Sequence, residues 1–121
     1  MKKRTVVTGL GAVSPLGLSV AELWGGLISG KSGIAAITRF DTSAYPCRIA
    51  GEVKNFDPTS CIDKKEVRRM DLAAQYGVYA SEEAVKDSGL DLTSIDLDRC
   101  GVVIGSGIGG IGTFEKQHSI L

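Results

Sequence analysis

The feature that most constrains this chain is a glycine-rich stretch, GVVIGSGIGGIG, at residues 101–112. It opens with the uncharged β-branched run 102–104, which is typical of a strand buried on both faces. The glycines that follow allow a tight turn and a close approach of backbone or ligand. Helical spacing then resumes at Thr113. A strand, a glycine turn and a helix in succession predict a site at the carboxyl end of a strand in an α/β sheet.

The start of the chain repeats this pattern. Residues 5–8 are rich in β-formers, and Gly9 and Gly11 end the expected strand at a loop through residues 14–17. Ser19 and Glu22 stand three apart before an apolar run, the arrangement of a capping box, so a helix is expected over residues 20–29 with Gly30 as its stop. The side chains expected to face inward from this helix are Leu23, Leu27 and Trp24.

The middle of the chain is harder to interpret and leads into the longest expected helix. Residues 39–45 are typical of a loop, and residues 48–54 alternate loosely, as in an edge strand. Asp63 and Glu66 repeat the capping pattern and predict a helix over residues 63–88, kinked near Met70 and ended by Gly89. Its buried stripe is narrow and formed mostly by small residues, which predicts close packing: Ala73, Tyr76, Gly77, Ala80 and Ala84.

The order of these elements predicts the fold class. A strand, two helices and a second strand, joined by the polar connector 90–99, indicate a right-handed crossover in a parallel sheet. The chain is therefore expected to be α/β. A core of two strands is too small to be covered by these helices, so we expect residues 1–121 to be the first part of a longer protein.

Composition excludes several classes of function. The 121 residues include 14 basic and 14 acidic side chains, so net charge provides no general attraction to nucleic acid or to a membrane. The three cysteines have no disulfide-like or metal-like spacing, which favours a reduced, cytosolic protein without a metal site. Residues 2–4 are basic, but glycines and Pro15 interrupt the apolar run behind them, so neither a targeting nor a membrane segment is predicted.

Five segments in order carry a family resemblance. They are TVVTGLGAVSPLG at residues 5–17, SGKSGI at 29–34, RFDTSAYPCRIAGEV at 39–53, RRMD at 68–71 and IGSGIGG at 104–110. Together they resemble the beginning of a β-ketoacyl-[acyl carrier protein] synthase, the type II condensing enzyme of fatty acid synthesis. The resemblance covers essentially the whole chain.

The resemblance implies a thiolase-like fold with αβαβα layers, of which this chain would be the N-terminal part of the N-terminal domain. It also implies an acyltransferase that performs a decarboxylative Claisen condensation, with acyl and malonyl carrier protein as partners and no cofactor. The complete protein is then expected to be a cytoplasmic homodimer. The nucleophilic cysteine of the family falls after position 121, so residues 1–121 are expected to contain no catalytic residue and to be inactive alone.

Two groups of site residues follow from the resemblance. Gly107, Ile108 and Gly109 match the loop that lines the acyl-chain pocket of the family, which we favour over the other interpretation, that Ile108 only packs between strands or subunits. The cations Lys64, Lys65, Arg68 and Arg69 match a helix that docks the acidic carrier protein, although such patches are often solvated surface. Positive charge at a helix N-terminus opposes the helix dipole, which favours a functional reason for it.

The remaining reactive side chains are expected to be structural. Cys47, Cys61 and Cys100 are interpreted as inert, unpaired thiols. His118, the only histidine, shares a helical phase with Phe114 and is interpreted as a core or interface residue that holds a backbone carbonyl.

Two alternatives remain open at this point. Gly105, Gly107 and Gly110 satisfy G-x-G-x-x-G, the pattern of a dinucleotide-binding turn, although the acidic residue that would bind the ribose falls beyond residue 121. The second alternative keeps the condensing-enzyme fold without its catalysis. It is a non-catalytic chain-length-factor-like subunit; a polyketide ketosynthase subunit would keep both the fold and the condensation, in another pathway.

Overall fold

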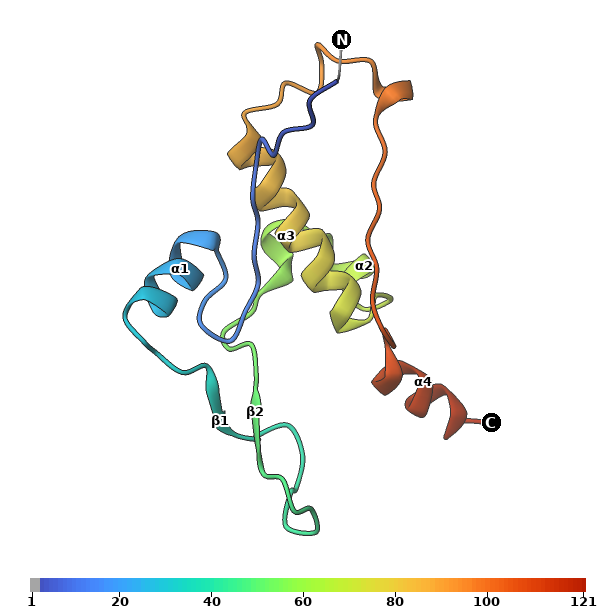
Figure 1. The fold of residues 1–121 in the computed structure, drawn as a ribbon. Coiled ribbons are helices and arrows are strands. Elements are labelled where there is room, and N and C mark those ends of the chain that lie inside the picture. Colours follow the sequence, from blue (N-terminus) through green and yellow to red (C-terminus); the bar gives the residue numbers. More distant parts are fainter. Residues whose placement is uncertain (1–2) are drawn as a thin grey trace.

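Helix α3, Leu72–Ser88, is the centre of the molecule. The computed structural model describes residues 3–121, and in it an extended N-terminal segment passes one side of α3 while the segment before α4 passes another (Figure 1). The remaining elements in chain order are α1 (Val20–Ile28), β1 (Ile34–Ala36), β2 (Ile49–Gly51), α2 (Lys64–Val67) and α4 (Ile111–His118), with short 3-10 turns at Pro58–Ser60 and Leu97–Arg99.

Helix α1 begins at the predicted cap and ends where expected. The Ser19 hydroxyl accepts the Glu22 N–H at 3.2 Å, while the Glu22 carboxylate accepts the Leu18 N–H, one residue before the position that a capping box requires. The expectation that Trp24 and Leu27 face inward is wrong, because they are 63% and 52% exposed. The buried residue of α1 is Gly26, which packs on the Leu16 side chain, so the small face of this helix points inward.

The single helix expected over residues 63–88 is two helices, separated at the predicted kink. Asp71 adopts an extended backbone conformation, and its side chain caps α3 by accepting the Ala73 N–H at 2.8 Å. The buried Gln75 side chain donates to the Val67 and Met70 carbonyls at 3.1 and 3.0 Å, which fastens the end of α2 to the first turn of α3. The predicted stop at Gly89 is confirmed by its left-handed backbone, φ 62°.

Close packing against the small residues of α3 is confirmed. A methyl group at Gly9 would collide with the Ala84 carbonyl, and one at Gly11 would collide with the Ala80 carbonyl. Backbone therefore lies directly on backbone here, which only glycine permits. Ala73, which was expected in the same stripe, is exposed because it lies in the first turn, beyond this contact.

Two acidic side chains of α3 hold the N-terminal segment in place. The Asp87 carboxylate accepts the Leu10 N–H at 2.9 Å. The two oxygens of Glu83 accept the N–H groups of Ala12 and Val20 at 2.8 and 2.9 Å. In a sheet, these N–H groups would donate to carbonyls of a neighbouring strand. Here they donate to carboxylates of α3 instead.

The middle of the chain forms a small antiparallel hairpin. Strands β1 and β2 pair with Ile34 opposite Gly51, and the predicted loop at residues 39–45 connects them. Strand β2 lies inside the edge strand expected over residues 48–54, whereas β1 was not predicted. Phe56, just after β2, packs edge-on against Tyr76 and Tyr79 of α3, with ring centroids 4.7 and 5.3 Å apart.

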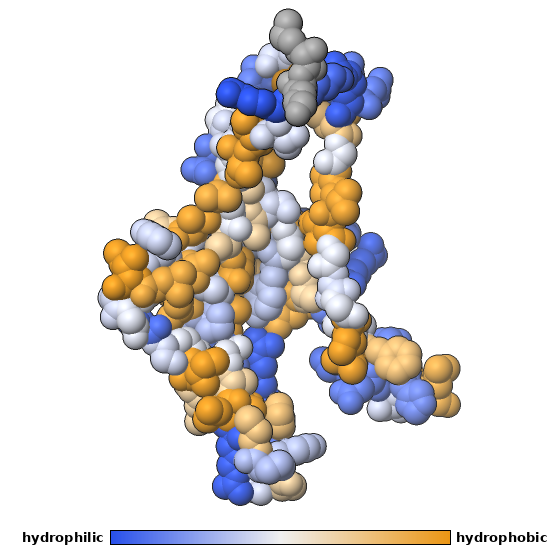
Figure 2. Space-filling view, viewed as in Figure 1, coloured by the Kyte–Doolittle hydropathy of each residue, from blue (hydrophilic) through white to orange (hydrophobic). Residues whose placement is uncertain are grey.

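The two strands predicted at residues 5–8 and 102–104 are not formed in the described part of the chain. Both segments are extended but unpaired, and the sheet present within residues 3–121 is antiparallel rather than parallel. The expectation of burial is wrong as well, since Val103 is 99% exposed, and Figure 2 shows apolar surface along the segment before α4. The physical reason is that a strand needs a neighbouring strand for its backbone groups, and neither segment has one within residues 3–121.

The described residues bury little apolar surface. Ile62, 7% exposed, is the buried hydrophobic residue within residues 3–121, and it follows the Pro58–Ser60 turn where this turn contacts α2 and α3. In that part of the chain no helix combines the length and hydropathy needed to cross a membrane. Met1 and Lys2, of which Lys2 belongs to the basic start noted in the sequence, lie outside the described residues.

Candidate functional site

The glycine loop, residues 105–110, presents its central side chain to the surface. Ile108 is 81% exposed, and nothing lies within 4 Å of the position that a methyl group would take on Gly105 or Gly107. The loop is fixed internally by a 3.0 Å hydrogen bond from the Gly109 N–H to the Ser106 hydroxyl. Gly109 itself has φ 74°, a conformation that favours glycine. The apolar side chain of Ile108 is thus exposed on a backbone turn of defined conformation.

The far end of the glycine loop is anchored to α3. A methyl group on Gly110 would lie 2.7 Å from the Asp71 carboxyl carbon, so the loop backbone rests on this side chain. Three residues later, the Thr113 hydroxyl donates to Asp71 Oδ2 at 2.8 Å. Asp71 Oδ1 remains bound to the Ala73 N–H, so each carboxylate oxygen has its own donor.

These donors have an electrostatic effect on Asp71. The Ala73 N–H, and after it the Thr113 hydroxyl, hold the pKa of the Asp71 carboxyl below its usual 3.8. Both hydrogen bonds favour the charged form of the acid, and Lys116 in α4 adds a smaller attraction in the same direction. Asp71 is therefore an ionised anchor at neutral pH.

The predicted docking cations form an exposed cluster on and just after α2. This basic cluster comprises Lys64, Lys65, Arg68 and Arg69, all of which are exposed. Arg69 makes a 3.5 Å ion pair with Glu66, whereas the other three have no carboxylate within ion-pair distance among residues 3–121. The Asp63 side chain caps α2 by accepting the Lys65 N–H at 2.8 Å, so the cap of the predicted box is confirmed. Glu66 reaches Arg69 instead of returning to the cap.

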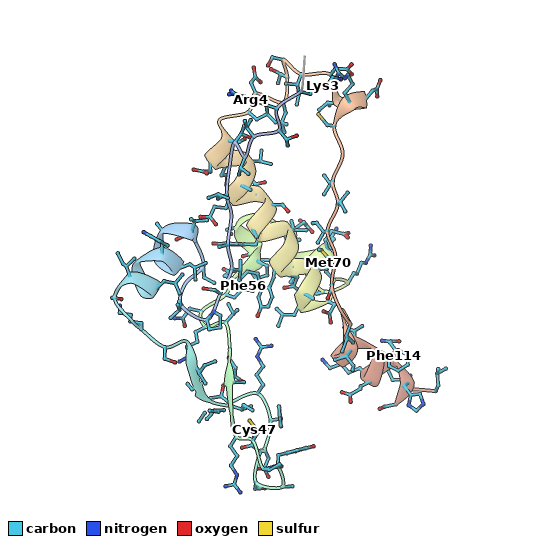
Figure 3. All side chains as sticks on the ribbon, viewed as in Figure 1. Lys3, Arg4, Cys47, Phe56, Met70 and Phe114 are labelled. Carbon is cyan, nitrogen blue, oxygen red and sulfur yellow. The ribbon has the colours of Figure 1, made fainter. Side chains whose placement is uncertain are left out.

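The structure brings the basic cluster and the glycine loop to the same joint. Arg69 precedes Asp71 by two residues, and Asp71 contacts Gly110 and Thr113 on the other side. In Figure 3, Met70 at this joint lies beside the descending segment that leads to α4 and Phe114. Two groups of residues that are about 40 positions apart in sequence are thus connected through one side chain.

Asp71 and Thr113 were missed by reasoning from sequence. The expected helix ran through position 71, so its aspartate was treated as an ordinary helical residue. A usable signal was present, because aspartate is favoured at helix N-caps and disfavoured in helix interiors. No local pattern indicated Thr113, since its partner lies 42 residues away.

The remaining reactive side chains do not form a catalytic group in the described residues. Cys47 and Cys100 are exposed, Cys61 is half-buried, and none is in a disulfide. His118 is exposed rather than in a core, and it stacks on Phe114 with a centroid distance of 6.4 Å instead of holding a carbonyl. Within residues 3–121 no cluster of three or more histidine, cysteine or acidic residues could hold a metal ion.

A hollow that the sequence did not predict lies beside α1. It has a volume of about 690 Å³ and lies between α1 and the turn at residues 14–17. Glu22, Lys31 and Lys54 line it together with Leu16 and Leu18, so its wall combines charged and apolar side chains. It is separate from the glycine loop and does not share residues with it.

The dinucleotide alternative lacks its structural context. Its glycines, Gly105, Gly107 and Gly110, do precede a helix, but residues 101–106 form no strand. A dinucleotide-binding turn requires the strand, because the sheet fixes the turn under the phosphates.

Comparisons with known proteins give consistent matches. Among curated relatives, the 3-oxoacyl-[acyl-carrier-protein] synthase 2 of Synechocystis sp. is 48% identical over 120 residues, which is 99% of this chain and 29% of the relative. The protein of the same name from Staphylococcus aureus is 52% identical over 119 residues, 98% of this chain and 29% of the relative. The chain thus spans less than a third of the length of these relatives.

Solved structures agree. The ishigamide ketosynthase/chain length factor superposes with a TM-score of 0.74 at 34% identity, over 95% of this chain and 29% of that one. A type II PKS ketosynthase in complex with its acyl-carrier protein superposes with a TM-score of 0.78 at 30% identity, over 100% of this chain and 32% of that one. The fold class is therefore the thiolase-like fold of the ketosynthases, as the family resemblance implied. A family model described as "Beta-ketoacyl synthase, N-terminal domain" matches residues 2–120, and the chain belongs to this family.

Proposed function

We propose that this chain is the N-terminal part of the N-terminal domain of a condensing enzyme of fatty acid synthesis. The observation that carries the proposal is the identity of 48% and 52% to two 3-oxoacyl-[acyl-carrier-protein] synthases along almost the whole chain. The complete protein would be an acyltransferase that elongates carrier-bound acyl chains with malonyl carrier protein.

The proposed reaction has two covalent stages. An enzyme thiolate attacks the acyl-carrier thioester, and the carrier thiol leaves as the acyl-enzyme forms. Malonyl carrier then loses carbon dioxide, and the resulting carbanion attacks the acyl-enzyme carbonyl and expels the enzyme thiolate. Backbone amides and other donors would stabilise the enolate and the oxyanion.

We place the nucleophile outside residues 1–121. The thiols of Cys47, Cys61 and Cys100 each lie 3.5–3.6 Å from a backbone carbonyl. In each of these contacts the thiol donates a hydrogen bond to the carbonyl oxygen, whereas a nucleophilic cysteine needs donors or positive charge around its sulfur. Residues 1–121 alone are therefore expected to show no condensation.

Ile108 is proposed to form part of the wall of the acyl-chain pocket. In support, an isoleucine that is 81% exposed on a glycine loop exposes apolar surface that an acyl chain would cover. Gly107 and Gly109 have no side chains and would allow the acyl chain to pass close to the protein backbone. The other interpretation is that Ile108 packs against further strands or another subunit, which predicts the same exposure. Substitution of Ile108 and measurement of the chain-length preference distinguish the two interpretations.

The basic cluster is proposed to dock the acidic carrier protein. In support, Lys64, Lys65 and Arg68 have no ion-pair partner among residues 3–121, so their charges are available to an acidic surface. A structural relative at 30% identity is a ketosynthase in complex with its acyl-carrier protein.

We further propose that the complete protein is a cytoplasmic homodimer, and light scattering of the purified protein would test the dimer.

One alternative is kept because a structural comparison favours it. The ishigamide relative is a ketosynthase/chain length factor, so the complete protein could be a non-catalytic chain-length-factor-like subunit or a polyketide ketosynthase subunit. A chain-length factor differs from a condensing enzyme mainly at the nucleophilic cysteine, which we place outside residues 1–121, so these residues fit both interpretations.

A single experiment distinguishes a condensing enzyme from the non-catalytic chain-length-factor alternative. The complete protein is incubated with an acyl carrier protein loaded with a saturated acyl chain, and its mass is measured before and after malonyl carrier is added. A condensing enzyme gains the acyl mass and then releases a product two carbons longer. A protein that never becomes acylated would reject the enzyme proposal and favour the chain-length-factor alternative.

A further inference from the structure

The contact between Asp71 and Thr113 is the strongest feature that the proposed function leaves unexplained. It is a hydrogen bond of 2.8 Å between side chains 42 residues apart. The other aspartate–threonine pairs, Asp57–Thr59 and Asp91–Thr93, span two residues and only shape a local turn. The Asp71–Thr113 bond instead joins the start of α3 to the first turn of α4.

This bond controls the end of the glycine loop. Gly110 rests on the Asp71 side chain, and Thr113 is bonded to it, so two successive parts of the chain after Ile108 contact one carboxylate. Before Ile108, the contact with α3 is made by Ile104, whose Cγ2 atom would lie 3.5 Å from a methyl group on Gly77. Between these two contacts the hydrogen bonds of the loop are local: the Gly109 N–H donates to the Ser106 hydroxyl, and the Ile111 N–H donates to the Gly109 carbonyl.

On its other side, Asp71 is fixed to the basic cluster. Gln75, which is buried, donates to the carbonyls of Val67 and Met70 and thereby holds the end of α2 against α3. Asp71 lies within this fastened segment and caps α3. Its carboxylate therefore has a defined position relative to the basic cluster, independently of the glycine loop.

We propose that Asp71 is a positioning residue, which through Thr113 and Gly110 sets the place of the Ile108 loop relative to the docking helix and so affects which acyl chains are accepted. The inference rests on the proposed function. Asp71 touches no substrate in this proposal, because its two oxygens are occupied by Ala73 and Thr113. Its effect reaches the acyl chain only through the loop.

The test replaces the hydroxyl donor while keeping its shape. In the complete enzyme, Thr113→Val removes the bond and Thr113→Ser retains it. We expect Thr113→Val to change the ratio of kcat/KM for a long and a short acyl carrier by about 3- to 10-fold, the range of one net hydrogen bond. Because a loop that is free to move excludes fewer acyl chains, discrimination by chain length should weaken in Thr113→Val. The Thr113→Ser variant, which keeps the hydroxyl, should discriminate as the wild type does.

Two further variants separate positioning from general stability. Thr93→Val removes a hydroxyl–carboxylate bond of 2.6 Å in the connector before residue 101, and it should leave the ratio unchanged. Asp71→Asn keeps a good helix cap but no longer offers a charged acceptor, so it should shift the ratio in the same direction as Thr113→Val. Both changes act on the same Asp71–Thr113 hydrogen bond. The double variant, Asp71→Asn with Thr113→Val, should therefore resemble the Thr113→Val single variant rather than show the sum of both effects.

The outcomes are distinct. Wild-type protein that condenses no acyl carrier rejects the proposed function. The positioning role alone is overturned if the wild-type protein is active and Thr113→Val has the same kcat/KM ratio as the wild type. It is also overturned if Thr113→Ser shifts this ratio as much as Thr113→Val does. If Thr113→Val folds poorly, hydrogen exchange of the Gly109 and Ile111 amides in Asp71→Asn decides the question, because both amides donate hydrogen bonds within the loop. Faster exchange supports the proposal, and unchanged exchange contradicts it.

Discussion

Two glycine segments contact the same helix in this molecule, and they are held in opposite ways. Gly9 and Gly11 lie directly on carbonyls of α3, and Glu83 and Asp87 bind the backbone around them. The glycine loop at residues 105–110 is open along most of its length and touches α3 through Asp71. The same sequence pattern thus serves tight packing in one place and exposure in the other. Close packing favours a scaffold, whereas exposure favours a surface that meets a ligand.

The largest effect is expected where the first segment is tightest. Gly11→Ala places a methyl group against the Ala80 carbonyl, and the backbone must move apart to accept it. We expect this change to lower the free energy of unfolding of the complete protein by about 1–3 kcal/mol or more. The measurement is urea denaturation.

The matched control is the same substitution in the open loop. Nothing lies within 4 Å of a methyl group on Gly107, so Gly107→Ala should change the unfolding free energy by no more than about 0.5 kcal/mol. Equal losses in both variants would mean that the two segments are equally packed in the complete protein, and the comparison would fail.

The next effect concerns chain length and tests the exposed segment. Ile108→Phe enlarges the side chain proposed to face the acyl chain, so kcat/KM for long acyl chains should fall about tenfold more than that for short ones, because a filled pocket excludes length first. Ile28→Phe, at an isoleucine of α1 that is 70% exposed, is the control and should not discriminate by length. A uniform loss across all chain lengths for Ile108→Phe would favour packing over a pocket.

A smaller effect is expected from the basic cluster. Reversing two charges, Arg68→Glu together with Arg69→Glu, should raise KM for the carrier-bound donor several-fold to about tenfold and reduce its dependence on salt. Lys3→Glu with Arg4→Glu reverses the same number of charges near the other end of the molecule, away from Met70 (Figure 3). If both pairs of changes raise KM equally, the effect is net charge rather than docking.

Sequence predicted the ends of the helices better than it predicted the strands and the tertiary contacts. Ser19, Asp63 and Gly89 act through neighbours a few residues away, and their caps and stop were foreseen. The exposure of residues 102–104 was not foreseeable in the same way, because strand pairing needs partners far along the chain. Periodicity reports which residues could be buried, and only neighbouring elements decide whether they are.

The candidate site shows the same division. Ile108 and the basic cluster were proposed from a family resemblance, and the chain does belong to that family. Asp71, which connects them, was hidden because a helix pattern of 26 residues had been drawn through it. Its contact with Thr113 depends on the fold as a whole, and no spacing rule encodes it.

The smallest effect tests the connection itself, through the pKa of Asp71. The bond from Thr113 is the second cause, after the Ala73 N–H, of the lowered pKa of this carboxyl. In the folded protein Asp71 therefore adds stability that is present above its usual 3.8 and lost as pH falls through its lower folded value. Thr113→Val should raise the pKa only part of the way back, because Ala73 still donates, and carbon-detected NMR of the aspartate carboxyls measures this directly.

The Asp91 carboxyl is the internal reference for that titration. Its pKa is also lowered, first by the Thr93 hydroxyl and then by the Thr93 N–H, and neither donor changes in Thr113→Val. A pKa that rises at Asp71 and stays constant at Asp91 confirms that the glycine loop is held through this one carboxylate. If neither pKa moves, the hydroxyl is not bound in solution. The loop would then have no polar contact with α3, and the contrast with the packed N-terminal segment would be greater still.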